Sequence, residues 1–117
     1  MRILTVLAVL FIGSALNQTA DAQLLPTKLR VTVIDGLGNF VEGATVSIYE
    51  NEADYRASEN AVSTMTTDKK GRVTFKDVKP VSYYIEATFD GKNNNGEGVM
   101  TSELSEGKIN KVNTVIE

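Results

Sequence analysis

A period of two in the hydrophobic pattern is the feature that most constrains the fold of this chain. In residues 28–35 (KLRVTVID), Leu29, Val31 and Val33 alternate with polar side chains, and residues 43–50 (GATVSIYE) repeat the pattern. Alternating side chains of a strand point to opposite faces, so this period indicates strands with one buried face. We predict strands near 28–35, 43–50, 62–68, 72–76, 82–90, 99–103 and 109–116.

Turn-forming residues separate these segments, and no long helical pattern follows the N-terminal segment. Residues 50–61 are polar and predict a loop or one helical turn, whereas residues 91–98 (GKNNNGEG) predict a turn that adds nothing to a core. Parallel strands need long crossover connections, which favours antiparallel pairing here. The fold class predicted is therefore all-β, an antiparallel seven-stranded β-sandwich of the prealbumin-like or Ig-like kind.

The N-terminus has the pattern of a cleavable signal peptide. Arg2 precedes the uncharged apolar run 3–16 (ILTVLAVLFIGSAL), and Ala20-Asp21-Ala22 is a small-x-small cleavage pattern. The run is shorter than the roughly 20 residues that cross a bilayer, which disfavours a retained anchor. We predict a signal peptide at 1–22, one mature domain at 23–117 without stable membrane insertion, and a secreted or periplasmic location.

Composition narrows the chemistry that this chain can perform. The net charge of -3 gives no reason to expect nucleic acid or anionic membrane as a partner. The chain has no histidine and no cysteine, which excludes Ser-His and Cys-His nucleophiles. Zinc sites rarely consist of carboxylates alone. Paired carboxylates remain, but solvated acids need desolvation to become catalytic, so we predict no catalytic residue, no cofactor and no metal.

The segment 66–78 (TTDKKGRVTFKDV) predicts two strands joined by a tight turn. Asp68 is expected to accept hydrogen bonds from the turn backbone, and Gly71 to take the positive φ that closes a hairpin. A metal-binding role for Asp68 is disfavoured because hard cations need several oxygen ligands.

A binding surface is the remaining class of site. Tyr49, Tyr55 and Tyr84 are the aromatic residues least tied to the inward face, and such rings can stack on a sugar or contact a peptide. Asn93, Asn94 and Asn95 form a candidate contact loop at one end of the sandwich. The same tyrosines can instead simply cover strand surfaces, and an exposed edge strand offers a third route to a partner.

Three blocks in order carry a resemblance to a known family. The blocks are VTVIDGLGNFVEGATVSIYE, TTDKKGRVTFKDV and KPVSYYIEA, within about residues 28 to 90. They resemble the carboxypeptidase regulatory-like domain, also called transthyretin-like or prealbumin-like, in its short exported form from Bacteroidetes-type bacteria. On this resemblance Gly43-Ala44 would be the small pair entering the second strand and Tyr83 the inward aromatic residue. Val81-Ser82 departs from the Gly-x of the family at that corner.

The resemblance implies an accessory module without catalytic residues of its own. We expect a binding or structural role, with an unknown protein or glycan at the cell envelope as partner: protein interaction first, carbohydrate binding as the alternative. A hydrolase of the transthyretin-like type is the third and least favoured function. The hydrolases of hydroxyisourate in that group resemble one another through histidines and a C-terminal Tyr-Arg-Gly-Ser, whereas this chain has no histidine and ends in NTVIE.

Collagen-adhesin B-type domains, which are related, form an internal Lys-Asn amide beside a buried acid. Glu86 resembles that acid, and Asn110 or Asn113 resembles the partner in the last strand. The lysine expected in the first strand is replaced by Val33-Ile34, and Lys28 lies too early. We therefore do not expect the amide to form.

Overall fold

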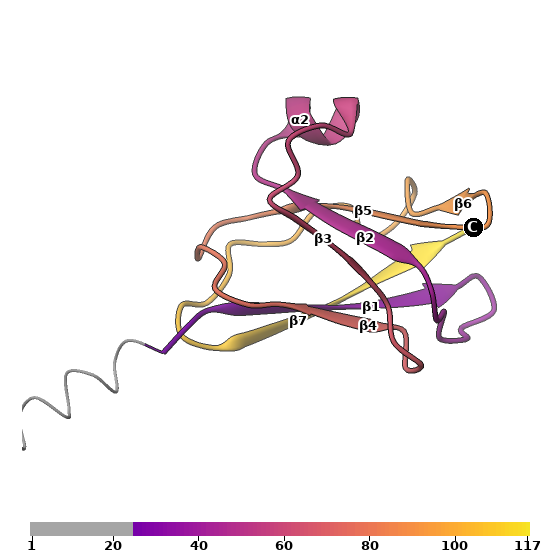
Figure 1. Cartoon of the computed structure of the whole chain (residues 1–117), viewed down its shortest axis with the longest axis horizontal. Coiled ribbons are helices and arrows are strands. Elements are labelled where there is room, and N and C mark those ends of the chain that lie inside the picture. Colours follow the sequence, from indigo (N-terminus) through magenta and orange to yellow (C-terminus); the bar gives the residue numbers. More distant parts are fainter. Residues whose placement is uncertain (1–24) are drawn as a thin grey trace, which may run out of the picture.

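The computed structural model describes residues 25–117, which form two stacked β-sheets with one short helix outside them (Figure 1). The predicted signal peptide at 1–22 lies outside the described residues. The elements are β1 (Lys28–Asp35), β2 (Thr45–Tyr49), α2 (Glu52–Ala57), β3 (Ser63–Thr66), β4 (Arg72–Phe75), β5 (Tyr84–Phe89), β6 (Lys92–Asn93) and β7 (Ile109–Ile116). No helix in this described part is long and apolar enough to cross a membrane.

The strands are divided between two sheets. Sheet A has the order β4-β1-β7, and sheet B has the order β3-β2-β5-β6. The all-β sandwich predicted from the sequence is confirmed, but purely antiparallel pairing is wrong, because β1 and β7 are parallel along their full length from Lys28–Ile109 to Asp35–Ile116. A parallel pair needs a long crossover, and here the whole chain between the first and last strands supplies it.

The turn at residues 67–71 does not close a hairpin, which corrects a second expectation. β3 pairs with β2 in sheet B, whereas β4 pairs with β1 in sheet A. The turn therefore carries the chain from one sheet to the other. Asp68 Oδ1 accepts hydrogen bonds from the backbone N–H groups of Lys70 (2.8 Å) and Arg72 (3.0 Å), and Gly71 has φ of 72°.

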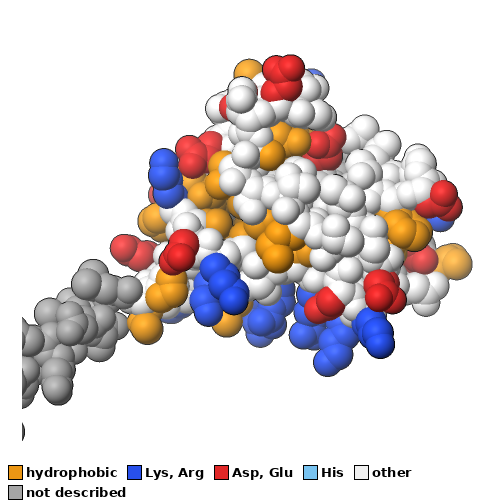
Figure 2. All heavy atoms as spheres, viewed as in Figure 1, with side chains coloured by type: hydrophobic (Ala, Val, Ile, Leu, Met, Phe, Trp, Pro, Cys, Tyr) orange, Lys and Arg blue, Asp and Glu red, His pale blue; other side chains and the backbone are white. Residues whose placement is uncertain are grey.

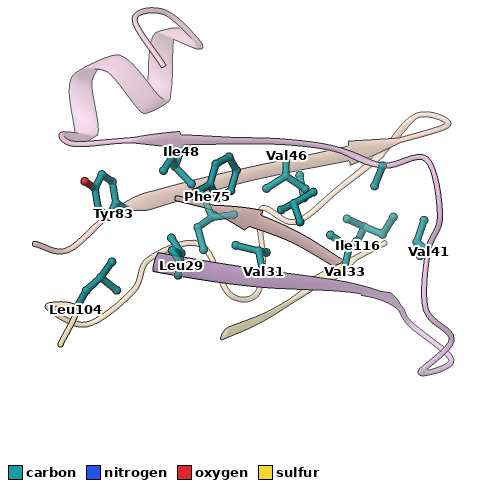
Figure 3. Close-up of a cluster of buried hydrophobic side chains, with 14 residues drawn as sticks. Leu29, Val31, Val33, Val41, Val46, Ile48, Phe75, Tyr83, Leu104 and Ile116 are labelled. Atoms are coloured by element: carbon teal, nitrogen blue, oxygen red, sulfur yellow. The ribbon is translucent and has the colours of Figure 1, made fainter. Parts of the chain in front are cut away.

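The core fills the space between the two sheets (Figure 3). The inward residues of β1 are Leu29, Val31 and Val33, which are completely buried as their alternation predicts. They lie beside the inward residues of β4, which include Phe75, and face the inward residues of sheet B. Phe75 and Tyr83, which directly precedes β5, are the largest of the buried side chains. The remaining core members are Val41, Ala44, Val46, Ile48, Val73, Ile85, Ala87, Leu104 and Ile116. Burial of aliphatic and aromatic surface is therefore the main stabilising term in a chain without disulfides.

Two expectations for the last third of the chain are also wrong. No named strand covers 99–103, where only Met100 forms an isolated bridge with Tyr84. Phe89, expected on the buried face, is 38% exposed at the end of β5, beside Gly43. The loop at 91–98 contains the short strand β6 and a residue of the interior, which is described below.

Candidate functional site

A cluster of three tyrosines lies on the outer face of sheet B, beneath α2. Tyr49 and Tyr84 are directly opposite each other in the antiparallel β2–β5 pair. Tyr55 comes from α2 and joins them. Its ring stacks on that of Tyr84 with centroids 5.5 Å apart and planes at 25°, and it meets the ring of Tyr49 edge to face at 5.9 Å and 72°. Two sheet residues and one helix residue therefore form a single aromatic surface.

Local sequence determines where α2 begins and ends. Asn51 is the N-cap residue, and its side chain accepts a hydrogen bond from Asp54 N at 2.9 Å. Ser58 ends the helix in the left-handed region with φ of 53°. Between these caps, Arg56 forms an ion pair with Glu52 one turn earlier. The helix is short, so its caps and the packing of Tyr55 hold it on the sheet.

A groove runs beside the tyrosine cluster, with a volume of about 610 Å³. We call it the tyrosine groove. It is lined by Glu52, Tyr55, Arg56, Ser58, Tyr84, Glu86, Asn95 and Val99. The lining combines two aromatic rings with a guanidinium, carboxylates and an amide. Such a mixture suits a ligand that has both an apolar face and hydrogen-bonding groups.

Glu86 is one of the two carboxylates that line the tyrosine groove, and each of its oxygens accepts a hydrogen bond. Oε1 accepts a hydrogen bond from the Tyr49 hydroxyl at 2.6 Å, and Oε2 accepts one from the Ser58 hydroxyl at 2.9 Å. Desolvation, and then the hydrogen bond to Glu86, raise the pKa of Tyr49 above its ordinary value of 10.0. Desolvation and the nearby charge of Glu86 raise the pKa of Tyr55 as well. Both phenols are therefore neutral at physiological pH and serve as hydrogen-bonding or stacking groups.

The structure separates the residues that the sequence grouped as one surface. Tyr55 and Tyr84 are half-buried, and together with the exposed Asn95 they line the tyrosine groove. Tyr49 is on the outward face but is only 2% exposed, because Tyr55 and α2 cover it. Asn93 lies elsewhere, in a hollow of about 600 Å³ at the opposite end of sheet B, with Phe89 and Lys92.

Asn94 is completely buried, which corrects its assignment to a contact surface. Its Oδ1 accepts a hydrogen bond from Ala87 N at 2.9 Å, and its Nδ2 donates to Ile85 O at 3.0 Å and to Thr114 Oγ1 at 2.7 Å. The amide thus takes the place of a neighbouring strand beside β5 and links sheet B to β7 of sheet A. Its role is structural.

Sequence reasoning about binding missed five members of the groove, namely Glu52, Arg56, Ser58, Glu86 and Val99. A signal for Glu86 was present, since it lies two positions after Tyr84 in a strand of period two and so shares its face. Ser58, Arg56 and Val99 depend on how α2 and the loop after β6 fold over the sheet, which no local pattern encodes.

The residues that a metal site or an internal amide would need are not brought together in the described part of the chain. Within residues 25–117, no three His, Cys, Asp or Glu side chains are grouped so that they could hold a metal ion. Glu86, the acid that resembles the one beside an internal amide, lies on the outer face of β5 and is bound by Tyr49 and Ser58. The Asn110 side chain donates to the carbonyl oxygens of Lys28 and Ser105. This arrangement differs from a lysine, an asparagine and an acid meeting inside a core.

Comparison with solved structures shows the same fold in proteins of different kinds. The TIE protein of Bacillus anthracis is 22% identical with a TM-score of 0.58, over 79% of this chain and 17% of that one. A streptococcal ancillary pilin is 17% identical with a TM-score of 0.59, over 79% and 32%. A catechol 1,2-dioxygenase variant from Acinetobacter radioresistens is 12% identical with a TM-score of 0.51, over 82% and 53%. This chain spans only part of each, and these likenesses concern the fold alone.

The family comparison covers most of the described chain. No curated protein matches the sequence. The model of the carboxypeptidase regulatory-like domain matches residues 28–114, from the start of β1 to within β7. The resemblance seen in the three sequence blocks is thereby confirmed, and it extends through the last strand. This chain belongs to the carboxypeptidase regulatory-like domain family.

Proposed function

We propose that this protein is a non-catalytic interaction module, secreted or periplasmic, that binds a protein partner at the bacterial cell envelope through the tyrosine groove. The observation that carries the proposal is the stacked pair Tyr55–Tyr84, held half-exposed at the wall of an open groove. Rigid aromatic rings in a partly desolvated hollow are typical anchors of protein interfaces.

Two further observations support this proposal. The chain belongs to the carboxypeptidase regulatory-like domain family, and a regulatory-like domain favours an interaction or structural role over catalysis. The groove carboxylate, Glu86, has each oxygen engaged by a hydroxyl group of the protein itself. These two bonds fix the orientation of the carboxylate against β2 and α2, which suits a positioning role for Glu86.

Affinity capture from an envelope extract tests this function. The full-length sequence, with a C-terminal tag, is expressed for export, and the purified protein is used as bait; its intact mass also reports whether cleavage occurs after Ala22. Wild type and Met65→Ala, which alters an exposed side chain of β3 outside the groove, are expected to capture the same protein. Tyr84→Ala and Tyr55→Ala are expected to lose it.

Far-ultraviolet circular dichroism establishes that each variant used in the capture remains folded. A folded Tyr84→Ala and a folded Tyr55→Ala that both retain the partner would refute the assignment to the groove. Two variants are used because Tyr84 lies in a central strand and Tyr55 in the outer helix.

Carbohydrate binding at the same groove is the second candidate. It is favoured by the combination of the two rings with Arg56, Asn95 and Glu86, because sugars are bound by stacking on aromatic rings and by planar polar side chains. A glycan array screened with the exported protein separates the two functions. Specific glycan signals that disappear in Tyr84→Ala, with no captured protein, would favour the carbohydrate-binding function.

A further inference from the structure

The outer face of sheet A carries a patch of positive charge far from the tyrosine groove. Residues paired across a sheet share a face, so the register fixes its members. Arg30 in the central strand β1 is opposite Lys111 of β7 on one side and Thr74 of β4 on the other. Thr32, the next outward residue of β1, is opposite Arg72. Lys28 and Lys76 extend the same face at the start of β1 and just after β4. We call Lys28, Arg30, Arg72, Lys76 and Lys111 the basic face.

The net charge of the chain gives no sign of this patch, because the acidic residues lie outside it. The whole chain has a net charge of -3, yet no Asp or Glu lies among the outward residues of these rows. Figure 2 shows several Lys and Arg side chains along the lower edge of the molecule, where Figure 1 places β1 and β4, with some Asp and Glu side chains at one end of that edge. In residues 25–117, the two ion pairs are Arg56–Glu52 and Lys79–Glu50, and neither involves the basic face.

Two acids, Asp35 and Asp68, lie at the end of β1 and in the turn before β4. Asp35 accepts hydrogen bonds from the N–H groups of Leu37 and Asn39, and Asp68 accepts them from Lys70 and Arg72. These bonds lower the pKa of both carboxyls and hold them against their own turns. Asp77 follows Lys76 in the chain and is exposed. Both carboxylates stay charged, and Asp68 offsets part of the charge of Arg72. The strand rows themselves carry no acid among their outward residues, so they keep an excess of positive charge.

Arg30 lies at the centre of the basic face, and its side chain makes one long hydrogen bond across the sheet. Its Nε donates to Thr74 Oγ1 at 3.4 Å across the β1–β4 pair, and the residue is half-buried. That bond uses one edge of the guanidinium and leaves both terminal nitrogens for another acceptor. A guanidinium presents its N–H groups as a fork that matches the two oxygens of a carboxylate.

An apolar group adjoins the cations at one end of the same face. Ile34 and Val115 are paired outward residues of β1 and β7, and both are half-buried. Phe40 forms a bridge with Ile34 and is 63% exposed. An exposed aromatic ring next to central arginines is typical of the hot spots of protein interfaces, whereas polyanions such as glycans and nucleic acids offer few apolar groups in return.

We propose that the basic face is a second interaction surface, which binds a protein segment that carries several Asp or Glu carboxylates and an apolar side chain. The carboxylates pair with Arg30, Arg72 and Lys111, and the apolar side chain packs on Phe40 and Ile34. In an extended segment, side chains on one face are about 6.6 Å apart, as are Lys28 and Arg30 on β1. This surface is on the opposite sheet from the tyrosine groove, so the protein would bind two partners at once.

Fluorescence anisotropy tests the proposal with labelled peptides and the exported, purified protein. The probe is a short oligo-glutamate with one terminal leucine, and its comparison peptide has glutamine at every glutamate position. We expect the glutamate peptide to bind and the glutamine peptide not to bind. Arg30→Gln combined with Lys111→Gln is expected to weaken binding by about tenfold or more, since hydrogen bonds to charged groups are the stronger ones.

Lys79→Gln combined with Lys92→Gln is the matched control, because it removes the same charge from positions outside sheet A. We expect its affinity to stay within about twofold of wild type, as for charges outside the contact. Lys76→Gln combined with Lys111→Gln changes only exposed side chains and keeps the test valid if the loss of Arg30 impairs folding. This pair should also weaken binding.

Three results would overturn the proposal. One is equal loss of affinity in the control and basic-face variants, which would mean that only net charge matters. Another is no binding of the glutamate peptide. The third is binding of a sulfated polysaccharide or of vesicles with anionic lipid in the absence of peptide binding, which would assign the face to a different class of partner.

Discussion

The hydroxyl of Tyr49 donates a 2.6 Å hydrogen bond to Glu86, and so connects neighbouring strands of sheet B on the face that carries α2. The second oxygen of Glu86 accepts from Ser58, at the end of α2. One carboxylate therefore links β2, β5 and the helix. Because Tyr55 comes from that helix, the hydrogen bonds of Glu86 position the stacked ring pair of the tyrosine groove.

Tyr49→Phe removes the hydrogen bond to Glu86 while it keeps the ring. We expect a loss of about 1–2 kcal/mol in the free energy of unfolding, because Glu86 loses the hydrogen bond from the buried hydroxyl and phenylalanine offers no donor in its place. Urea unfolding measures this loss. Ser58→Ala removes the exposed partner of the same carboxylate, and its smaller effect serves as the comparison. Equal stability of Tyr49→Phe and wild type would contradict the linking role.

Asn94→Ala should be among the most destabilising single substitutions of a polar side chain. It leaves Ala87 N and Ile85 O without partners in the interior, and each buried unsatisfied group costs about 1–3 kcal/mol. Thermal or urea unfolding provides the measurement. Asn95→Ala, next in the chain but exposed, is the control, with an expected change within about 0.5 kcal/mol. A tolerated Asn94→Ala would mean that the amide does not take the place of a strand.

Gly71→Ala tests the sheet-switching turn. The residue has φ of 72°, and an added Cβ would lie 2.7 Å from the carbonyl oxygen of Val33. Gly91→Ala is a matched control, since φ is 80° but no atom lies within 4 Å of the added Cβ. Left-handed backbone costs a side chain about 1–2 kcal/mol, so Gly91→Ala should lose that much and Gly71→Ala clearly more. Similar stabilities of the two variants in urea unfolding would argue against the close approach of the turn to β1.

Asp68 makes the stability of the fold depend on acid pH. Its backbone hydrogen bonds from Arg72 and Lys70 lower the pKa in the folded state below the ordinary value of 3.8. The deprotonated carboxylate is thus favoured by folding, and its contribution is complete above pH 3.8 and is lost as the pH falls through the lower folded-state pKa. Asp68→Asn should therefore flatten the fall in melting temperature on acidification. An unchanged acid profile would rule out this contribution.

The alternation of residues 28–35 was enough to predict β1 and its buried face, because a period of two is a local property of a strand. The pairing of strands was not predictable in the same way. β1 and β7 are at opposite ends of the chain and meet in parallel, and the turn at Asp68 changes sheets instead of closing a hairpin. Such contacts depend on packing between distant segments, to which local patterns contribute little.

The candidate binding surfaces also depend on contacts between distant segments, which the sequence pattern predicts only in part. Tyr55 and Tyr84 were identified as aromatic residues not tied to the inward face, and the structure brings them into contact. Asn94 looked like a loop residue because turn-forming neighbours surround it, yet its burial depends on strand β7 some 20 residues later. The basic face was invisible because composition reports only the net charge, whereas the register of three strands decides where Arg30 and Lys111 lie.

Hydrogen–deuterium exchange on the captured complex, compared with the free protein, tests the central claim most directly. If the protein is an interaction module that uses the tyrosine groove, the partner should slow exchange in α2 and in β5 around Tyr84, while the turn at Gly91 stays unchanged. Protection that is absent from both α2 and β5, in a complex that remains intact during the measurement, would contradict the account.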